Sequence, residues 1–133
     1  MDCCVCKKAM VILDLDGVEV DHCFSCGGIW LDQGELDLLL KDPKKTSSLL
    51  DSVKTLEPHH EEKRKCPICR STMKTKKIED KKPLRIDLCL KNHGLWFDRG
   101  ELEEILNQAN TPESLRVAAH LKEIFKFHFT TTK

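Results

Sequence analysis

Apolar and polar positions alternate in a short segment near the start of the chain. The run Met10-Val-Ile-Leu-Asp-Leu is followed by Asp16-Gly17, and Val18-Glu-Val-Asp comes directly after that pair. An Asp-Gly pair supplies the positive φ angles that a two-residue hairpin turn requires. The pattern therefore predicts an antiparallel hairpin that turns at Asp16-Gly17.

Two further segments have the spacing of one face of a helix. Their apolar positions are Leu36, Leu39 and Leu40 in the first segment and Leu102, Ile105 and Leu106 in the second. An Asp precedes each segment, and a Glu follows that Asp by three residues, which is the pattern of a helix capping box. We predict N-caps at Asp32 and Asp98, supported by Glu35 and Glu101. Capping explains these carboxylates, and no nucleophile or His accompanies them, so an acid–base catalytic pair is disfavoured.

A third helix is predicted at the end of the chain, over residues 111–129. It begins at Thr111-Pro112-Glu113, with Thr as the cap and Pro at the first helical position. The apolar stripe of this helix consists of Leu115, Ala118, Leu121, Ile124, Phe125 and His128. We expect the stripe to dock on the rest of the chain or on a second chain.

The first part of the chain is repeated in the second part. The string CGGIWLDQGEL, from Cys26 to Leu36, returns as NHGLWFDRGEL, from Asn92 to Leu102. The repeat predicts two similar units, residues 1–41 (copy one) and 64–108 (copy two). Residues 42–63 read as a linker, with a short helix beginning at Thr46 whose apolar side consists of Leu49, Leu50, Val53 and Leu56.

Composition suggests that these units need help to fold. Aromatic residues make up only 5% of the 133 residues, yet the chain has eight Cys. Units of about forty residues rarely stabilise themselves with a hydrophobic core alone. The longest apolar runs, Met10–Leu13 and Leu38–Leu40, are too short for a signal peptide or a membrane span. We therefore expect a cytoplasmic protein with no membrane partner, in which CxxC pairs are metal ligands rather than disulfides.

Copy one carries a complete set of zinc ligands. Cys3 and Cys6 form one CxxC pair, and Cys23 and Cys26 form a second pair sixteen residues later. This spacing is typical of a tetrahedral structural zinc site. An alternative is that the pairs are redox dithiols. However, four half-sites lie at matching positions, two in each copy, which favours metal. Cys4 is out of phase with both pairs, so we interpret it as a thiol that takes no part in the site.

Copy two departs from this pattern at one position. Cys66, Cys69 and Cys89 match the ligands of copy one, whereas Asn92 stands where Cys26 stood. An amide is a poor zinc ligand beside thiolates, and His93 follows directly. We predict a Cys3His site closed by His93, so that each chain holds two zinc ions. Two alternatives remain open: a second copy without tightly bound zinc, and a coordination position occupied by water.

The string from Cys23 to Leu36, preceded by Cys3-x-x-Cys6 and a hairpin, resembles a known family. This is the transcription-factor zinc finger, named for its likeness to the zinc ribbon of transcription factor IIB. The resemblance covers about residues 1–40 and 64–106 and implies a zinc ribbon whose Cys residues bind the metal. It implies no reaction. The fold class we expect is small α+β, with two tandem zinc ribbons, a partly helical linker and a C-terminal helix.

Charge is distributed unevenly although its formal sum is zero. Residues 1–40 have a net charge of −6, and residues 63–85 have a net charge of +8. A basic hairpin of this kind can bind phosphates. The candidate nucleic-acid contacts are Lys74, Lys76, Lys77, Lys81, Lys82 and Arg85. The alternatives are a solvated edge strand protected by Lys and charge pairing between the two copies, within one chain or in a homodimer.

The sequence thus favours a non-catalytic zinc module that binds a macromolecule. Nucleic acid is the leading partner, through the basic second hairpin and in a transcription-related role. A protein-interaction adaptor that uses the C-terminal helix is the alternative. An enzyme is the least favoured of the three classes, because nothing near the second site supplies a general base or a substrate pocket.

Overall fold

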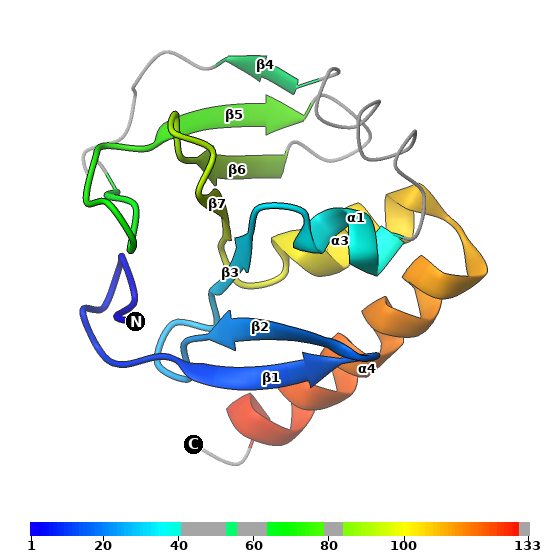
Figure 1. Cartoon of the computed structure of the whole chain (residues 1–133). Coiled ribbons are helices and arrows are strands. Elements are labelled where there is room, and N and C mark those ends of the chain that lie inside the picture. The colour runs from blue at the N-terminus through cyan, green and yellow to red at the C-terminus, as the bar shows by residue number, and fades with distance from the viewer. Residues whose placement is uncertain (41–52, 56–63, 79–83, 131–133) are drawn as a thin grey trace.

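The fold joins both copies into one antiparallel sheet. The computed structural model describes residues 1–40, 53–55, 64–78 and 84–130 (Figure 1). Its strands are β1 (Val11–Leu15), β2 (Val18–His22), β3 (Ile29–Asp32), β4 (Val53–Thr55), β5 (Lys74–Ile78), β6 (Leu84–Leu88) and β7 (Gly94–Phe97). Its helices are α1 (Glu35–Leu40), α3 (Glu101–Ala109) and α4 (Pro112–Thr130). The result is a small α+β protein, as the sequence predicts.

The strand order shows how the copies are connected. Over the described residues the sheet has seven strands in the order β1-β2-β3-β7-β6-β5-β4. Each copy contributes a hairpin and one further strand, and β4, from the segment between the copies, is added at one edge. The two further strands, β3 and β7, pair in the middle. There Trp30 stands opposite Trp96, and Ile29 stands opposite Phe97. The charged hairpins therefore lie on opposite sides of the central pair, so attraction between them within one chain does not hold the copies together.

The hairpin of copy one is formed as predicted. Asp16 has φ 54° and Gly17 has φ 90°, which are the positive angles that the tight turn requires. The backbone N–H of Gly17 also donates to Oδ1 of Asp14 at 2.7 Å. In copy two, β5 and β6 pair from Lys74–Leu88 to Ile78–Leu84, and the turn between them lies outside the described residues.

The two faces of the sheet have different neighbours. Ile29, Leu31 and Phe97 point to the face that the helices cover, where they pack with buried side chains of α1, α3 and α4. Trp30 and Trp96 point to the opposite face and pack among the cysteines. In Figure 1 the sheet curves around α1 and α3, and the cysteine loops lie on the far side from these helices. The sheet thus separates an apolar core from a metal-binding layer.

Helix α4 packs against copy one and against α3. Val117, Ala118, Leu121 and Phe125 are buried, and Arg116 Nε lies 3.0 Å from Asp16 Oδ2 at the hairpin turn. The predicted cap is present and reciprocal: Thr111 Oγ1 accepts from the Ser114 N–H at 3.0 Å, and Ser114 Oγ accepts from the Thr111 N–H at 2.9 Å. The expectation for Leu115 was wrong, since it is exposed. Ser114 and Val117 face the core in its place.

The predicted capping boxes of α1 and α3 form only in part. Glu101 Oε1 accepts from the Asp98 N–H at 2.9 Å, and Glu35 accepts from the Asp32 N–H in the same way. The Asp carboxylates do not cap, however. Oδ1 of Asp32 instead accepts from the indole N–H of Trp30 at 2.9 Å, and Oδ1 of Asp98 accepts from that of Trp96 at 3.2 Å. The N-cap of α3 is Gly100, with no side-chain cap.

The linker is described only in part. Val53, which we expected on a helix, begins strand β4, and β4 pairs with β5. The expected helix start at Thr46, together with Leu49, Leu50 and Leu56, lies outside the described residues. No helix in the described part of the chain is long and apolar enough to cross a membrane.

Candidate metal centres

The first centre gathers four cysteines from two loops of copy one. Cys3 and Cys6 lie on the loop before β1, and Cys23 and Cys26 lie on the loop between β2 and β3; we call these loops knuckles. Their Sγ atoms all lie within 4.8 Å of one another, and Cys3 Sγ lies 3.7 Å from Cys26 Sγ. Four thiolates at a Zn–S distance of about 2.3 Å would be separated by about 3.8 Å in a tetrahedron.

The backbone of the first knuckle is shaped around Cys3. Lys7 adopts a left-handed conformation, with φ 64°, and its N–H donates to the Cys3 carbonyl at 3.0 Å. This turn directs the N–H groups of Val5 and Cys6 at Cys3 Sγ, at 3.3 Å each. Such bonds stabilise a thiolate. The two bonds therefore favour the thiolate form, which is the form that binds metal. Burial acts in the opposite direction and raises the pKa of Cys3.

The second centre has the same architecture with one different donor. Cys66, Cys69, Cys89 and His93 offer ligand atoms within 4.8 Å of one another. His93 Nδ1 lies 3.5 Å from Cys89 Sγ and 3.9 Å from Cys66 Sγ, and Cys69 Sγ lies 3.6 Å from Cys89 Sγ. These separations match a tetrahedral Cys3His site. The predicted replacement of Cys26 by His93, rather than by its immediate equivalent Asn92, is present in the geometry.

Asn92 has a backbone role in this arrangement. Its φ is 60°, a left-handed conformation, and its N–H donates to the Cys89 carbonyl at 3.0 Å. Asn tolerates this conformation better than most residues. The turn presents His93 to the sulfurs, and the carbonyl of His93 accepts from the Gln33 N–H of copy one at 3.0 Å.

The thiols of the second centre differ in their electrostatics. Hydrogen bonds from the side chain and backbone of Ser71 lower the pKa of Cys69 to about 6. Burial raises the pKa of Cys66, although its Sγ accepts from the Ile68 N–H at 3.4 Å. All eight cysteines are free thiols. Four thiolates in the first centre, and three thiolates with one imidazole in the second, lie close enough to share one ion and fit zinc.

Cys4 belongs to neither centre. It is buried and stands where copy two has Pro67, and it is absent from both donor sets. Burial raises its pKa to about 12. The interpretation of Cys4 as a thiol outside the site agrees with this position.

A polar network lies beside the second centre. Arg64 NH1 donates to Asp87 Oδ2 at 3.2 Å and also to Oδ1 of Asp98, the acceptor of the Trp96 indole. The Thr75 hydroxyl donates to the other oxygen of Asp87 at 2.6 Å. Because both carboxylates are engaged, the pKa of Arg64 is raised and its guanidinium stays charged. The network fixes the orientation of Trp96, which packs against the cysteines.

Comparison with known proteins agrees with this geometry. A family model described as "Transcription factor zinc-finger" matches residues 2–42 and again residues 65–108. The chain belongs to the transcription factor zinc-finger family. The two matched segments correspond to copy one and copy two, so the family assignment and the repeat agree. No curated protein and no solved structure gave a match.

Membership of the transcription factor zinc-finger family accounts for the donor sets. Two zinc ions fit the chain, one within the donor set of copy one and one within that of copy two; these sets are Cys3, Cys6, Cys23 and Cys26, and Cys66, Cys69, Cys89 and His93. Zinc bound by these donors would cross-link the two knuckles of each copy. Four protein donors complete a tetrahedron, as in structural zinc sites of ribbons and fingers.

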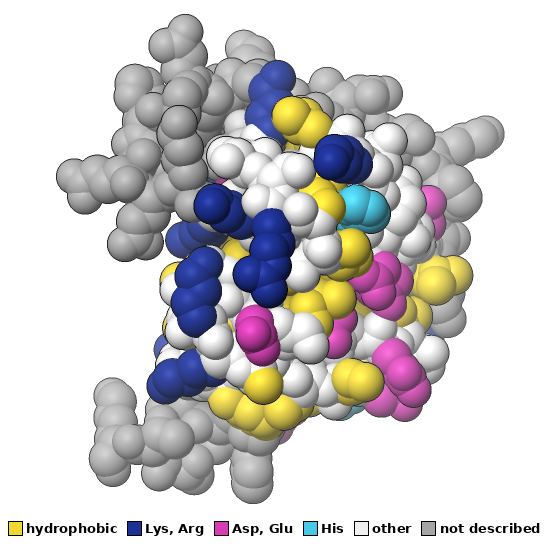
Figure 2. Space-filling view, turned by 60° about the vertical axis from the view of Figure 1, so that its left-hand side comes forward, with side chains coloured by type: hydrophobic (Ala, Val, Ile, Leu, Met, Phe, Trp, Pro, Cys, Tyr) yellow, Lys and Arg dark blue, Asp and Glu magenta, His cyan; other side chains and the backbone are white. Residues whose placement is uncertain are grey.

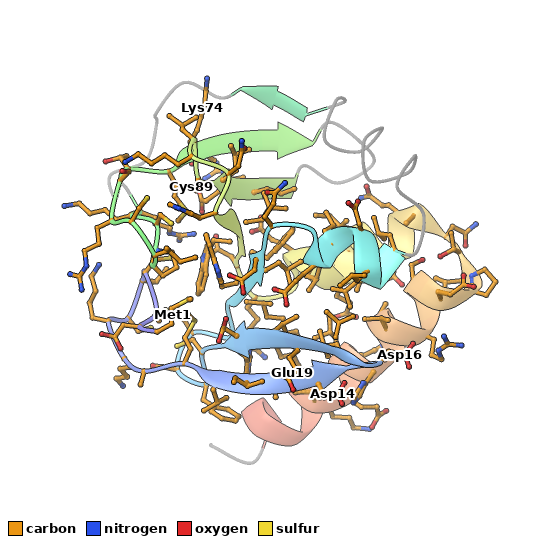
Figure 3. All side chains as sticks on the ribbon, in the orientation of Figure 1. Met1, Asp14, Asp16, Glu19, Lys74 and Cys89 are labelled. Atoms are coloured by element: carbon orange, nitrogen blue, oxygen red, sulfur yellow. The ribbon has the colours of Figure 1, made fainter. Side chains whose placement is uncertain are left out.

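The candidate nucleic-acid contacts are distributed along the second hairpin. Lys74 is exposed at the start of β5, and Arg85 is exposed on β6. Lys76 and Lys77 belong to β5, and Lys77 pairs with Arg85 in the ladder. Lys81 and Lys82 lie outside the described residues. In Figure 3, Lys74 and the acidic Asp14, Asp16 and Glu19 lie at opposite ends of the molecule.

Sequence reasoning missed a second group of cations. Lys7, Lys65 and Arg70 line a cleft of about 300 Å³ between the first knuckles of the two copies. Lys7 and Arg70 occupy equivalent positions, directly after each CxxC pair, and both are left-handed, with φ 64° and 62°. The signal was present in the alignment of the copies, because position 7 matches position 70.

Proposed function

We propose that this chain is a non-catalytic zinc module that binds nucleic acid through a cationic face at its knuckles and second hairpin. The observation that carries the proposal is the cleft between the first knuckles, which combines Lys7 of copy one with Lys65 and Arg70 of copy two. All three side chains are exposed. Figure 2 brings this side forward, and Lys and Arg side chains gather on it. Phosphates are the natural ligands of such a face.

The chemistry of the knuckles supports a backbone-binding mode. The left-handed turn that presents Cys3 also fixes the backbone of Lys7, and the same turn in copy two fixes Arg70, whose N–H donates to the Cys66 carbonyl at 2.8 Å. Zinc would therefore position two cations rigidly relative to each other. Ile68 and Leu90, at the tips of the second copy's knuckles, are 46% and 64% exposed, which adds apolar contact area beside the charges.

Other functions have less support. Val117, Leu121 and Phe125 of α4 already pack inside the chain, so an adaptor that uses the apolar face of this helix has lost its leading surface. Each centre offers four protein donors, which favours structural zinc over a catalytic ion with an open position. The description of the family is the support for a transcription-related role.

The proposal is tested by salt-dependent binding. Fluorescence anisotropy of labelled duplex DNA and single-stranded RNA is measured with the zinc-loaded chain between low and physiological salt. The triple variant Lys7→Gln, Lys65→Gln, Arg70→Gln should bind more weakly. On duplex DNA, the slope of log K against log salt should fall by about 0.9 for each phosphate that the variant no longer neutralises. The variant Lys76→Gln, Lys77→Gln, Lys81→Gln, Lys82→Gln tests the second hairpin separately.

A matched control removes the same charge from α4. Arg116→Gln, Lys122→Gln, Lys126→Gln has the same net charge as the knuckle variant and should bind almost as the parent does. Equal weakening by both triple variants would reduce the effect to net charge. Absence of binding at low salt would contradict the proposal directly.

A further inference from the structure

The two halves of the molecule contact each other through equivalent turns. In each copy, the residue directly after the Asp that precedes the helix (Asp32 or Asp98) contacts the second knuckle of the other copy. In one half this residue is Arg99, whose alkyl stem lies on Gly27: a Cβ added to Gly27 would come within 2.8 Å of Arg99 Cγ and Cδ. In the other half it is Gln33, whose N–H donates to the carbonyl of His93.

Arg99 and Gln33 occupy equivalent positions in the two copies, but their surroundings differ. Arg99 covers the knuckle of copy one. On the Gln33 side a groove of about 220 Å³ remains between α1 and the second knuckle of copy two. The groove residues that matter here are Asp32, Gln33, Leu36, Asp37, Asn92 and Leu95. At the same repeat position the chain thus carries an arginine whose stem lies along the opposing knuckle in one half, and a glutamine beside a groove in the other.

The lining of the groove suits the same kind of side chain. Leu36 is buried and Leu95 is half-buried, and these two provide an apolar floor for an alkyl stem. Asp32 and Asp37 provide carboxylates at the rim, and the described residues that line the groove include no Lys or Arg. A planar guanidinium matches carboxylates better than an ammonium does. Burial raises the pKa of Glu35 nearby, and the charge of Asp32 adds to that rise.

We propose that this groove receives an arginine side chain from a protein partner. The stem would lie across Leu36 and Leu95. The guanidinium would meet Asp37 and Oδ2 of Asp32, since Oδ1 of Asp32 already accepts from the Trp30 indole N–H at 2.9 Å. The groove shares no lining residue with the cleft of Lys7, Lys65 and Arg70, so this proposal does not depend on the nucleic-acid proposal. It gives the zinc module an arginine-reading subsite beside its second metal centre.

The test uses the full chain loaded with zinc and labelled with ¹⁵N. The probe is the blocked tripeptide acetyl-Gly-Arg-Gly-amide, and its citrulline counterpart is the neutral control of the same shape. The arginine peptide should shift the backbone amides of Gly34, Asn92 and Leu95 in a saturable way, with a Kd on the order of 1 mM, as expected for one side chain in a small groove. The citrulline peptide should leave them unchanged.

Two variants assign the effect to the groove. Gln33→Arg should place the chain's own arginine in the groove and abolish saturable binding, and Asp37→Asn should weaken binding about tenfold. Glu103 is the copy-two counterpart of Asp37 and does not line the groove. Glu103→Gln therefore removes one carboxylate elsewhere and should leave binding unchanged. Equal shifts with the citrulline peptide, or unchanged binding in both Gln33→Arg and Asp37→Asn, would overturn the proposal.

Discussion

Trp30 and Trp96 lie directly opposite each other where β3 pairs with β7. Each indole also packs over a glycine of the other copy: a Cβ added to Gly28 would overlap the Trp96 ring, and one added to Gly94 would overlap the Trp30 ring and the Leu31 carbonyl. Both rings are fully buried among the cysteines. The reciprocal contact joins two metal-binding units into one structure.

This contact predicts a large cost for a small substitution. Gly28→Ala should lower the free energy of unfolding of the zinc-loaded chain by about 3 kcal/mol, because the added methyl displaces a ring that has no room to move. Gly34 has open space around it and φ +90°, so Gly34→Ala should cost only the backbone strain of about 1–2 kcal/mol. Urea denaturation measures both. Similar losses in the two variants would argue against the ring contact.

The second metal centre predicts a specific loss of zinc. His93→Ala removes one of four donors, so the purified variant should carry about one zinc ion per chain in place of two, with the ligands of copy one still occupied. Asn92→Gly keeps the left-handed turn and removes the amide, so it should retain both ions. Elemental analysis decides between them. Retention of two ions by His93→Ala would show that His93 is not a ligand.

Cys4 is a buried thiol whose removal should leave both zinc ions bound. Because it belongs to neither donor set, Cys4→Ala should keep both zinc ions and lose at most the packing of one sulfur, about 1 kcal/mol. Cys6→Ala serves as the comparison and should release the zinc of copy one. Metal analysis that found the same loss in both variants would place Cys4 in the first centre.

Glu101 predicts a dependence of stability on pH. Burial raises its pKa to about 7, and both of its oxygens accept backbone N–H groups, from Arg85 at 2.8 Å and from Asp98 at 2.9 Å. Between the pKa of the unfolded chain, about 4.5, and that of the folded chain, the folded state holds more protons. The contribution of Glu101 to the free energy of unfolding therefore decreases as pH rises through this window and changes no further at higher pH.

The titration can be followed at the carboxyl itself. The ¹³C shift of the Glu101 side chain in the zinc-loaded protein, recorded from about pH 5.5 to 8.5 so that the metal stays bound, should show a midpoint near 7. A carboxyl already fully ionised at the lower limit would have an ordinary Glu pKa of about 4.5, and the predicted pH dependence would then be absent.

Local features of the sequence were sufficient for some parts of the structure. The Asp16-Gly17 turn depends only on backbone angles that those two residues accept. The metal centres depend on four donors that must reach one point, which explains why the offset from Cys26 to His93 was predictable. Thr111 and Pro112 mark the start of α4 for equally local reasons.

Other parts depend on contacts that no short segment encodes. Strands β3 and β7 are four residues each, and each pairs with the hairpin of its own copy on one side and with the other copy on the other side. The capping prediction for Asp98 was wrong because the Trp96 indole and Arg64 compete for the same carboxylate. Leu115 is exposed because the rotation of α4 is set by Ser114, Val117 and Leu121, which face the core.

Zinc in place of a large hydrophobic core is the central claim, and one measurement tests it most directly. The chain is purified without added metal, its zinc content is determined, and near-ultraviolet circular dichroism of Trp30 and Trp96 is followed during exhaustive chelation under reducing conditions. We predict about two zinc ions per chain and loss of the tryptophan signal as the ions leave. A chain that keeps this signal with no ion bound would contradict the claim.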